Sequence, residues 1–181
     1  MEPRRDRRVR RTRAALIGAF NHLLLAGRRR QRDITVAEIT DAADIGRSTF
    51  YEHYSSADAI FLDAANHPFG ILADAITGNA EPGALTHLLE HFWENRQLAR
   101  DTLVRLDGQI TRLLAGKIEG RLTAAGATPA IPMRLAALQL AEAALAPIRG
   151  WVTAEAPCAA DTLAGSLERT SAAMLGALTT R

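Results

Sequence analysis

The apolar residues of the chain recur every three or four positions, which is the spacing that lines one face of an α-helix. After a polar start, Leu16, Phe20 and Leu24 fall on one such face and predict a helix from residue 11 onward. The spacing continues to the C-terminus between clusters of Pro and Gly. We therefore expect an all-α protein, with later helices over residues 56–66 (or on to 77), 83–99, 101–125, 131–151 and 160–179. Pro147 lies inside the fourth of these and predicts a kink or an early stop there.

The segment from Ile34 to Ile39 is apolar enough to form a strand, but its polar residues favour a helix. Thr35 is a good N-cap, and Glu38 stands three residues later, so the two residues can form a capping box. Ile34 and Ile39 occupy the two positions of a hydrophobic staple. We expect a short helix over about residues 35–42.

A second short helix is expected from Arg47 to Tyr54, after a tight turn at Asp44-Ile45-Gly46. Gly46 tolerates unusual backbone angles and can also precede a helix start. Phe50 and Tyr54 would face the core. A longer helix followed by two short helices and a glycine-containing turn makes a helix-turn-helix, which predicts a DNA-binding domain over residues 11–55.

The charge of the chain is unevenly distributed. Residues 1–54 carry 12 arginines and 7 acidic residues, whereas residues 55–181 carry 10 basic and 13 acidic residues. Residues 1–10 are too polar to pack, so we expect them to form a flexible basic arm. A basic N-terminal part beside a helix-turn-helix points to a polyanionic partner.

Several protein classes are disfavoured by the composition. Cys158 is the only cysteine, so no intramolecular disulfide can form, which suits a reducing cytoplasm. No apolar run reaches the roughly 18–20 residues of a membrane span, and Asn21 and His22 interrupt the run that could belong to a signal peptide. We find no nucleophile–base pattern, phosphate loop or convincing metal set. We therefore expect neither an enzyme nor a bound cofactor.

Residues 35–60, TVAEITDAADIGRSTFYEHYSSADAI, closely resemble the DNA-binding signature of the TetR family of bacterial transcriptional regulators. The most specific part is the run Thr49-Phe50-Tyr51-Glu52-His53-Tyr54, and the resemblance is strong over residues 11–62. It implies that the second short helix is a recognition helix that lies in the major groove.

The residues at the start of this helix suit contacts with DNA. The fork of Arg47 can reach the two acceptors of guanine, and Ser48 and Thr49 can contact a base or a phosphate. The resemblance implies that Tyr51 and His53 also contact DNA. It further implies that Thr35 lies where a helix N-terminus touches a phosphate.

One position departs from the family pattern. Ala57 stands where the family often has a lysine at the start of the fourth helix, which predicts that one phosphate contact is missing. We expect the arginine-rich arm to compensate, with Arg8, Arg10 and Arg11 as contacts in the minor groove.

Over residues 56–181 the resemblance is weaker and implies a helical domain for effector binding and dimerisation. The last two long helices would form a four-helix bundle with a second copy of the chain; the alternative is a hairpin packed within one chain. The apolar residues in question are Leu135, Leu138, Leu145 and Ile148 on the first helix and Leu163, Leu167, Met174 and Leu178 on the second.

The effector site is less well defined by the sequence. His87 and His91 stand four residues apart and could form half of a metal site, but we favour surface or pocket-lining positions. Phe69, Trp93 and Trp151, together with Phe92, could line an effector cavity; we favour core positions for each.

The sequence thus predicts a cytoplasmic, dimeric transcriptional regulator that binds double-stranded DNA. By family analogy it is a repressor that a small-molecule effector releases from its operator. The alternatives are a ligand-independent dimeric DNA-binding protein and, less favoured, an all-helical enzyme.

Overall fold

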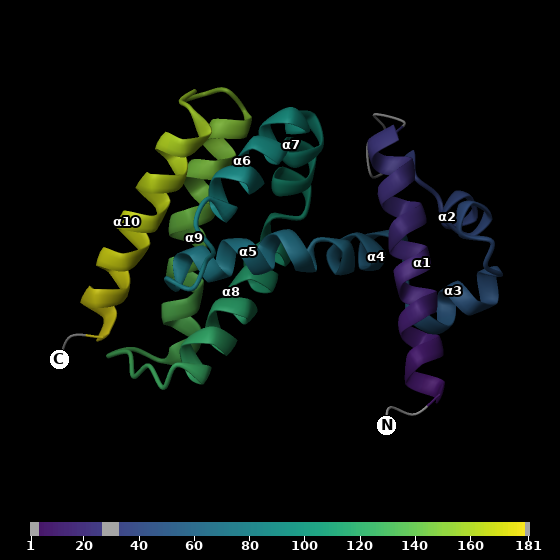
Figure 1. Cartoon of the computed structure of the whole chain (residues 1–181), viewed down its shortest axis with the longest axis horizontal. Helices are drawn as coiled ribbons and strands as arrows, with labels where there is room; N and C mark the ends of the chain where they lie inside the picture. Colours follow the sequence, from purple (N-terminus) through teal and green to yellow (C-terminus); the bar gives the residue numbers. More distant parts are fainter. Residues whose placement is uncertain (1–3, 27–32, 180–181) are drawn as a thin grey trace. The chain divides into compact units, whose positions relative to one another are not determined.

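The computed structural model describes residues 4–26 and 33–179, and these residues form ten α-helices and no β-strand (Figure 1). The chain divides into two compact units, Met1–Ala65 and Asn66–Arg181. The all-α class expected from the sequence is confirmed. Among the described residues, no helix combines the length and the apolar character that crossing a membrane requires.

The N-terminal unit contains α1 (Arg4–Ala26), α2 (Val36–Ala43), α3 (Arg47–His53) and α4 (Ala57–Ala64). Helix α1 packs against both α2 and α4. The rings of Phe20 on α1 and Phe61 on α4 meet edge to face, with their centroids 6.1 Å apart. The buried side chains of this unit come from all four helices and include Leu16, Phe20, Ile34, Ile39, Phe50, Tyr54 and Ile60.

The unit boundary at Ala65 places α4 in the N-terminal unit, whereas the sequence placed the boundary after residue 55. The physical reason is that Ile60 and Phe61 are buried in the same core as Phe20. Helix α4 is therefore needed to cover one side of α1.

The start of α1 differs from the expected flexible arm, because the helix begins at Arg4 and not at residue 11. Arginine is a good helix former, so a run rich in arginine can continue a helix that is anchored further along by Leu16 and Phe20. The remainder of the expected arm, residues 1–3, lies outside the described residues.

Helix α2 begins at the capping box that the sequence predicts. The Thr35 hydroxyl oxygen accepts a hydrogen bond from the Glu38 amide, and the Thr35 amide donates to Glu38 Oε2 at 2.9 Å. Ile34 and Ile39, the staple residues, are both buried. The segment is therefore a helix, and the strand interpretation is excluded.

The turn between α2 and α3 contains a left-handed residue, but it is Asp44 (φ 53°) and not Gly46 (φ −64°). Asp tolerates this conformation better than most residues because its short side chain bonds locally. The Ile45 amide donates to the Thr40 carbonyl at 3.0 Å and closes the end of α2. Gly46 is then left in an extended conformation as the N-cap of α3.

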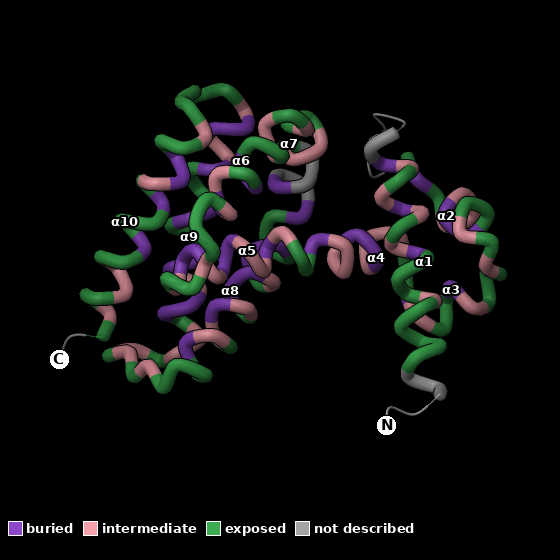
Figure 2. The backbone as a smooth tube through the Cα atoms, in the orientation of Figure 1, coloured by how far each residue is buried: buried purple, intermediate pink, exposed green. Residues whose placement is uncertain are grey.

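The C-terminal unit contains α5 (Asn66–Ile76), α6 (Ala84–Glu94), α7 (Arg96–Arg105), α8 (Asp107–Ala124), α9 (Met133–Val152) and α10 (Ala160–Thr179). The most extensive contact joins α8 and α9, and α5 packs on α8 while α10 packs on α5, α6 and α9. Buried positions follow these contacts, as the tube in Figure 2 shows. Where the sequence predicted long helices over 83–99 and 101–125, the chain breaks at Asn95 and Leu106 and forms three helices.

Pro147 does not end α9, which continues to Val152, so the expected early stop is wrong. Pro147 itself is exposed, whereas Leu145 and Ile148 on either side of it are fully buried. Burial of Leu145 and Ile148 therefore holds the helix together where the backbone hydrogen bond of the proline is lacking.

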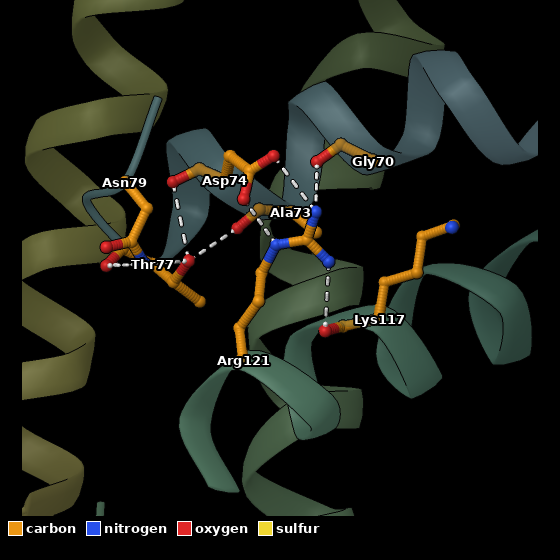
Figure 3. Close-up of polar contacts among 7 residues, drawn as sticks. All are labelled: Gly70, Ala73, Asp74, Thr77, Asn79, Lys117 and Arg121. Atoms are coloured by element: carbon orange, nitrogen blue, oxygen red, sulfur yellow. Dashed lines mark hydrogen bonds and ion pairs between the residues drawn. The ribbon is translucent and has the colours of Figure 1, made fainter. Parts of the chain in front are cut away.

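Two arginines tie the helices of this unit together. Arg121 of α8 donates to both carboxylate oxygens of Asp74 on α5, at 2.5 and 2.9 Å, and to the Gly70 carbonyl at 2.9 Å (Figure 3). Arg149 of α9 donates to both oxygens of Glu142 and pairs with Asp107 of α8. Each arginine lowers the pKa of the carboxyl that it contacts. The hydrogen bond from Arg121 lowers the pKa of Asp74, and the hydrogen bond from Arg149 lowers the pKa of Glu142.

Candidate nucleic-acid interface

Helix α3 is anchored by one face and presents the other to solvent. Phe50 is completely buried, and its ring lies 5.8 Å from that of Tyr54. Arg47 and Ser48 in the first turn are exposed, and 59% of Tyr51 is exposed. Thr49 and His53 are half-buried. The residues that the sequence assigned to base and phosphate contacts on this helix therefore fall on its accessible side or at the edge of that side.

The end of α3 is held by a polar network that the sequence did not reveal. The Tyr54 hydroxyl donates to Asp63 Oδ2 of α4 at 2.5 Å, and the Arg13 guanidinium of α1 donates to the same oxygen at 2.8 Å. Arg13 also lies over the Tyr54 ring, 5.4 Å from its centroid. The three residues join α1, α3 and α4, so they fix the orientation of α3 within its unit.

This environment changes the acid–base properties of the network. Burial, followed by the hydrogen bond to Asp63, raises the pKa of Tyr54 to about 12. Hydrogen bonds to Tyr54 and Asp63 raise the pKa of Arg13. Tyr54 was the one sequence feature that could have indicated this network, because a tyrosine expected in the core needs a polar partner for its hydroxyl.

Thr35 has a role within its own helix. Its hydroxyl accepts from the Glu38 amide at 3.3 Å and donates to Glu38 Oε2 at 2.9 Å. The residue is exposed, but both hydrogen-bonding functions of the hydroxyl are engaged in the capping box. The geometry therefore supports a role for Thr35 as the N-cap of α2.

The three arginines expected as arm contacts all lie on α1 and are exposed. Arg8 and Arg11, together with Arg7, line an open groove beside Ala43 and Ile45, at the end of α2 and in the turn before α3. Arg10 is not among the residues that line it.

The residues expected near an effector fall into separate groups in the C-terminal unit. Phe69 is buried and faces Phe92, with the ring centroids 6.5 Å apart. Trp151 is buried and donates its Nε1–H to the Cys158 carbonyl at 2.9 Å. Its ring lies beside that of the half-buried Trp93, with the centroids 4.9 Å apart and the planes tilted by 35°. The core interpretation favoured for Phe69 and Trp151 agrees with this packing.

His87 and His91 on α6 are both exposed. Among the described residues, no cluster of three or more His, Cys, Asp or Glu side chains is arranged to hold a metal ion. His91 instead lies beside the Asn95 amide, which is 3.4 Å from its Nδ1.

The N-terminal unit contains a helix-turn-helix, and the C-terminal unit is all-helical. This fold is similar to that of several solved TetR-family regulators. The TetR-family repressor AlkX from Dietzia sp. matches with a TM-score of 0.56 at 20% identity, over 93% of this chain and 98% of AlkX. The dihydroxyacetone kinase operon activator DhaS matches with a TM-score of 0.54 at 17% identity, over 93% of this chain and 98% of DhaS.

A TetR transcriptional regulator from Streptococcus agalactiae is also similar, with a TM-score of 0.51 at 23% identity over 92% of this chain and 97% of that chain. In sequence, the chain is 35% identical over 77 residues to the uncharacterized HTH-type transcriptional regulator YxbF of Bacillus subtilis. That match covers 42% of this chain and 20% of YxbF, so the chain spans a fifth of the length of this curated relative. No protein-family model matches the chain.

Proposed function

We propose that the protein is a sequence-specific DNA-binding transcriptional regulator of the cytoplasm that acts as a homodimer. The observation that carries the proposal is the division of α3 into a buried face and an accessible face. Phe50 and Tyr54 anchor the helix, while Arg47, Ser48 and Tyr51 extend into solvent. This is the arrangement that a recognition helix needs to enter the major groove.

In the proposed complex, Arg47 reads a guanine through its bidentate fork, and Ser48 and Thr49 contact a neighbouring base or phosphate. Tyr51 and His53 contact the backbone or nearby bases. The Arg13–Tyr54–Asp63 network contacts no DNA; it holds α3 at a fixed angle so that these side chains arrive together.

The dimer proposal is supported by the surface of α9 and α10. Leu145, Ile148, Leu163 and Leu167, which the sequence placed in the interface, are buried within one chain and so are not available to a second copy. The remaining face of α9 exposes 54% of Leu135, together with Ala143 and Ala146. The outer face of α10 exposes small residues, among them Ala173, Gly176 and Ala177. Two such pairs can approach closely across a twofold axis, as a four-helix bundle requires.

By analogy with the family, we infer that an effector bound in the C-terminal unit lowers the affinity for the operator. The sign of regulation differs among proteins with this fold, since AlkX is described as a repressor and DhaS as an activator. Repression released by a small molecule is the mode that we propose for this chain. A purified operator complex that no compound of a metabolite library dissociates would favour the ligand-independent alternative.

The direct test is a selection of genomic fragments by the purified full chain, followed by fluorescence anisotropy on the selected duplex. Wild-type protein should bind this duplex at least 10³-fold more tightly than random DNA. Arg47→Ala should lose about 1–3 kcal/mol of that preference. Arg112→Ala, which removes an exposed arginine from α8, is the matched control and should change nothing. Equal binding of wild type to all duplexes would contradict the proposal.

A further inference from the structure

A groove of about 620 Å³ runs along the N-terminal half of α1 in the N-terminal unit. One wall is α1 itself, and the other is the end of α2 and the turn before α3. The lining residues are Arg7, Arg8, Arg11, Thr12, Ala15, Ala43 and Ile45. Three of the seven are arginines and none is acidic, so the groove is strongly basic.

The helical start of α1 holds these arginines in a fixed register. Arg11 stands four positions after Arg7 and three positions after Arg8, so all three lie on one side of the helix. All three are exposed, and no hydrogen bond or ion pair joins them to another side chain within the described part of the chain. Their donors are therefore available to an external partner, and little ordering of the chain is needed to present them.

We propose that this groove holds a stretch of DNA phosphate backbone beside the bases that α3 reads. The inference rests on the proposed DNA-binding function and adds a second contact surface to it. It replaces the expected contact of a free arm in the minor groove by a rigid helical one, and it assigns Arg7 to the contact in place of Arg10.

Two features favour a nucleic-acid backbone over a single small anion. Arg7 and Arg11 lie one helical turn apart, about 6 Å along the axis, so they present a row of charges to a partner with repeated charges. The planar guanidinium fork also matches the paired oxygens of a phosphate.

The position of the groove favours DNA at the operator. Ile45 in its wall precedes Arg47 by two residues, and Gly46 between them is the N-cap of α3. A backbone seated in the groove therefore lies next to the first turn of the recognition helix. It can supply the phosphate contact that Ala57 cannot make.

The test is the salt dependence of binding by a triple variant of the full chain, Arg7→Gln, Arg8→Gln and Arg11→Gln. Anisotropy titrations between 50 and 300 mM salt would use the selected operator duplex and a random duplex. The slope of log affinity against log salt should fall by about 2 to 3 on both duplexes, because each lost phosphate contact removes roughly 0.9. The ratio between the two affinities should stay within about threefold of wild type, since phosphate contacts carry little sequence information.

Two controls make the result specific to the groove. The triple variant Arg96→Gln, Arg100→Gln and Arg112→Gln removes three exposed arginines from α7 and α8, away from the proposed dimer interface, and should keep the wild-type slope. The triple variant Arg7→Lys, Arg8→Lys and Arg11→Lys retains the positive charge and should keep most of the wild-type slope. Circular dichroism should give the same helical content for every variant.

An unchanged slope in the groove variant would overturn the proposal, as would a loss equal to that of the control triple. If wild type shows no preference for any genomic fragment, the proposed regulatory function fails. The slope on random DNA then still decides whether the groove binds the backbone.

Discussion

At the scale of single residues, Tyr51 of α3 and Tyr54, which caps the end of α3, have different roles: Tyr51 serves the proposed recognition and Tyr54 the stability of the fold. Tyr54 is 5% exposed and donates to Asp63, whereas Tyr51 is 59% exposed three positions before it. Removal of the phenol hydroxyl should therefore lower the stability of the fold at Tyr54 and weaken operator binding at Tyr51.

Tyr54→Phe should lower the free energy of unfolding by about 1 kcal/mol, because a buried hydrogen bond is lost while Arg13 and Asp63 keep each other. Tyr51→Phe should leave the stability unchanged and weaken operator binding. Urea unfolding followed by circular dichroism, with anisotropy on the same samples, measures both. Equal loss of stability in the two variants would contradict the assignment.

The raised pKa of Tyr54 sets the pH range of its contribution. Its folded pKa of about 12 lies above the ordinary value of 10.0. The stability that the neutral phenol provides is therefore complete below pH 10 and is lost as the pH rises towards 12. Wild type should lose stability relative to Tyr54→Phe over this interval.

Asp74 gives the opposite pH dependence. Its pKa is lowered by Arg121, so the pair stabilises the protein at neutral pH and loses its effect as the pH falls through the lowered pKa. Asp74→Asn should cost about 1 kcal/mol at pH 7, a modest amount because the pair is partly exposed. The difference from wild type should vanish in acid. Glu90→Gln, at an exposed position of α6, is the control in urea unfolding from pH 7 to pH 3.

At the scale of elements, the capping box favours the helix α2, Val36–Ala43, over a strand. The side chains of Thr35 and Glu38 satisfy each other's amides at the N-terminus of α2. The staple residues Ile34 and Ile39 secure the same turn from the core. Local side-chain chemistry therefore outweighs the apolar composition that could have supported a strand.

Thr35→Ala should lower the free energy of unfolding by about 1 kcal/mol, while Thr35→Ser should retain the cap. Urea unfolding measures the difference. If Thr35 acts through the cap, Thr35→Ser should also keep the operator affinity of wild type. A loss of affinity in Thr35→Ser without a loss of stability would instead indicate that the threonine contacts DNA directly.

At the scale of the whole molecule, the proposed dimer depends on small residues on α9 and α10. A substitution in an interface with twofold symmetry is present twice, so a bulky cation introduces both steric conflict and like charge. Ala146→Arg and Ala173→Arg should each shift the protein to monomers. Sedimentation equilibrium measures the mass, with Ala14→Arg on the exposed face of α1 as the control.

The monomeric variants should also bind a palindromic operator much more weakly than wild type, because the second head no longer benefits from a high local concentration. Binding to a single half-site should be unchanged. Dimers that persist in both arginine variants would show that the interface lies elsewhere.

The sequence by itself determined the local features of this protein. The period of apolar residues set the helical class, and the capping box and staple set the start of α2. The run from Thr49 to Tyr54 identified α3 and which of its faces is buried. These features depend on residues close together in the chain, so their spacing carries the information.

The tertiary structure decided what depends on contacts between distant residues. Arg13 and Asp63 are 50 positions apart, and Arg121 and Asp74 are 47 apart. The spacing of residues along the sequence therefore could not predict either hydrogen-bonded pair. Burial against neighbouring helices carries α9 through Pro147 and turns Leu145 and Leu167 inward, away from the proposed interface. It also places Arg7, Arg8 and Arg11 opposite Ala43 and Ile45, because a groove exists only where two elements pack side by side.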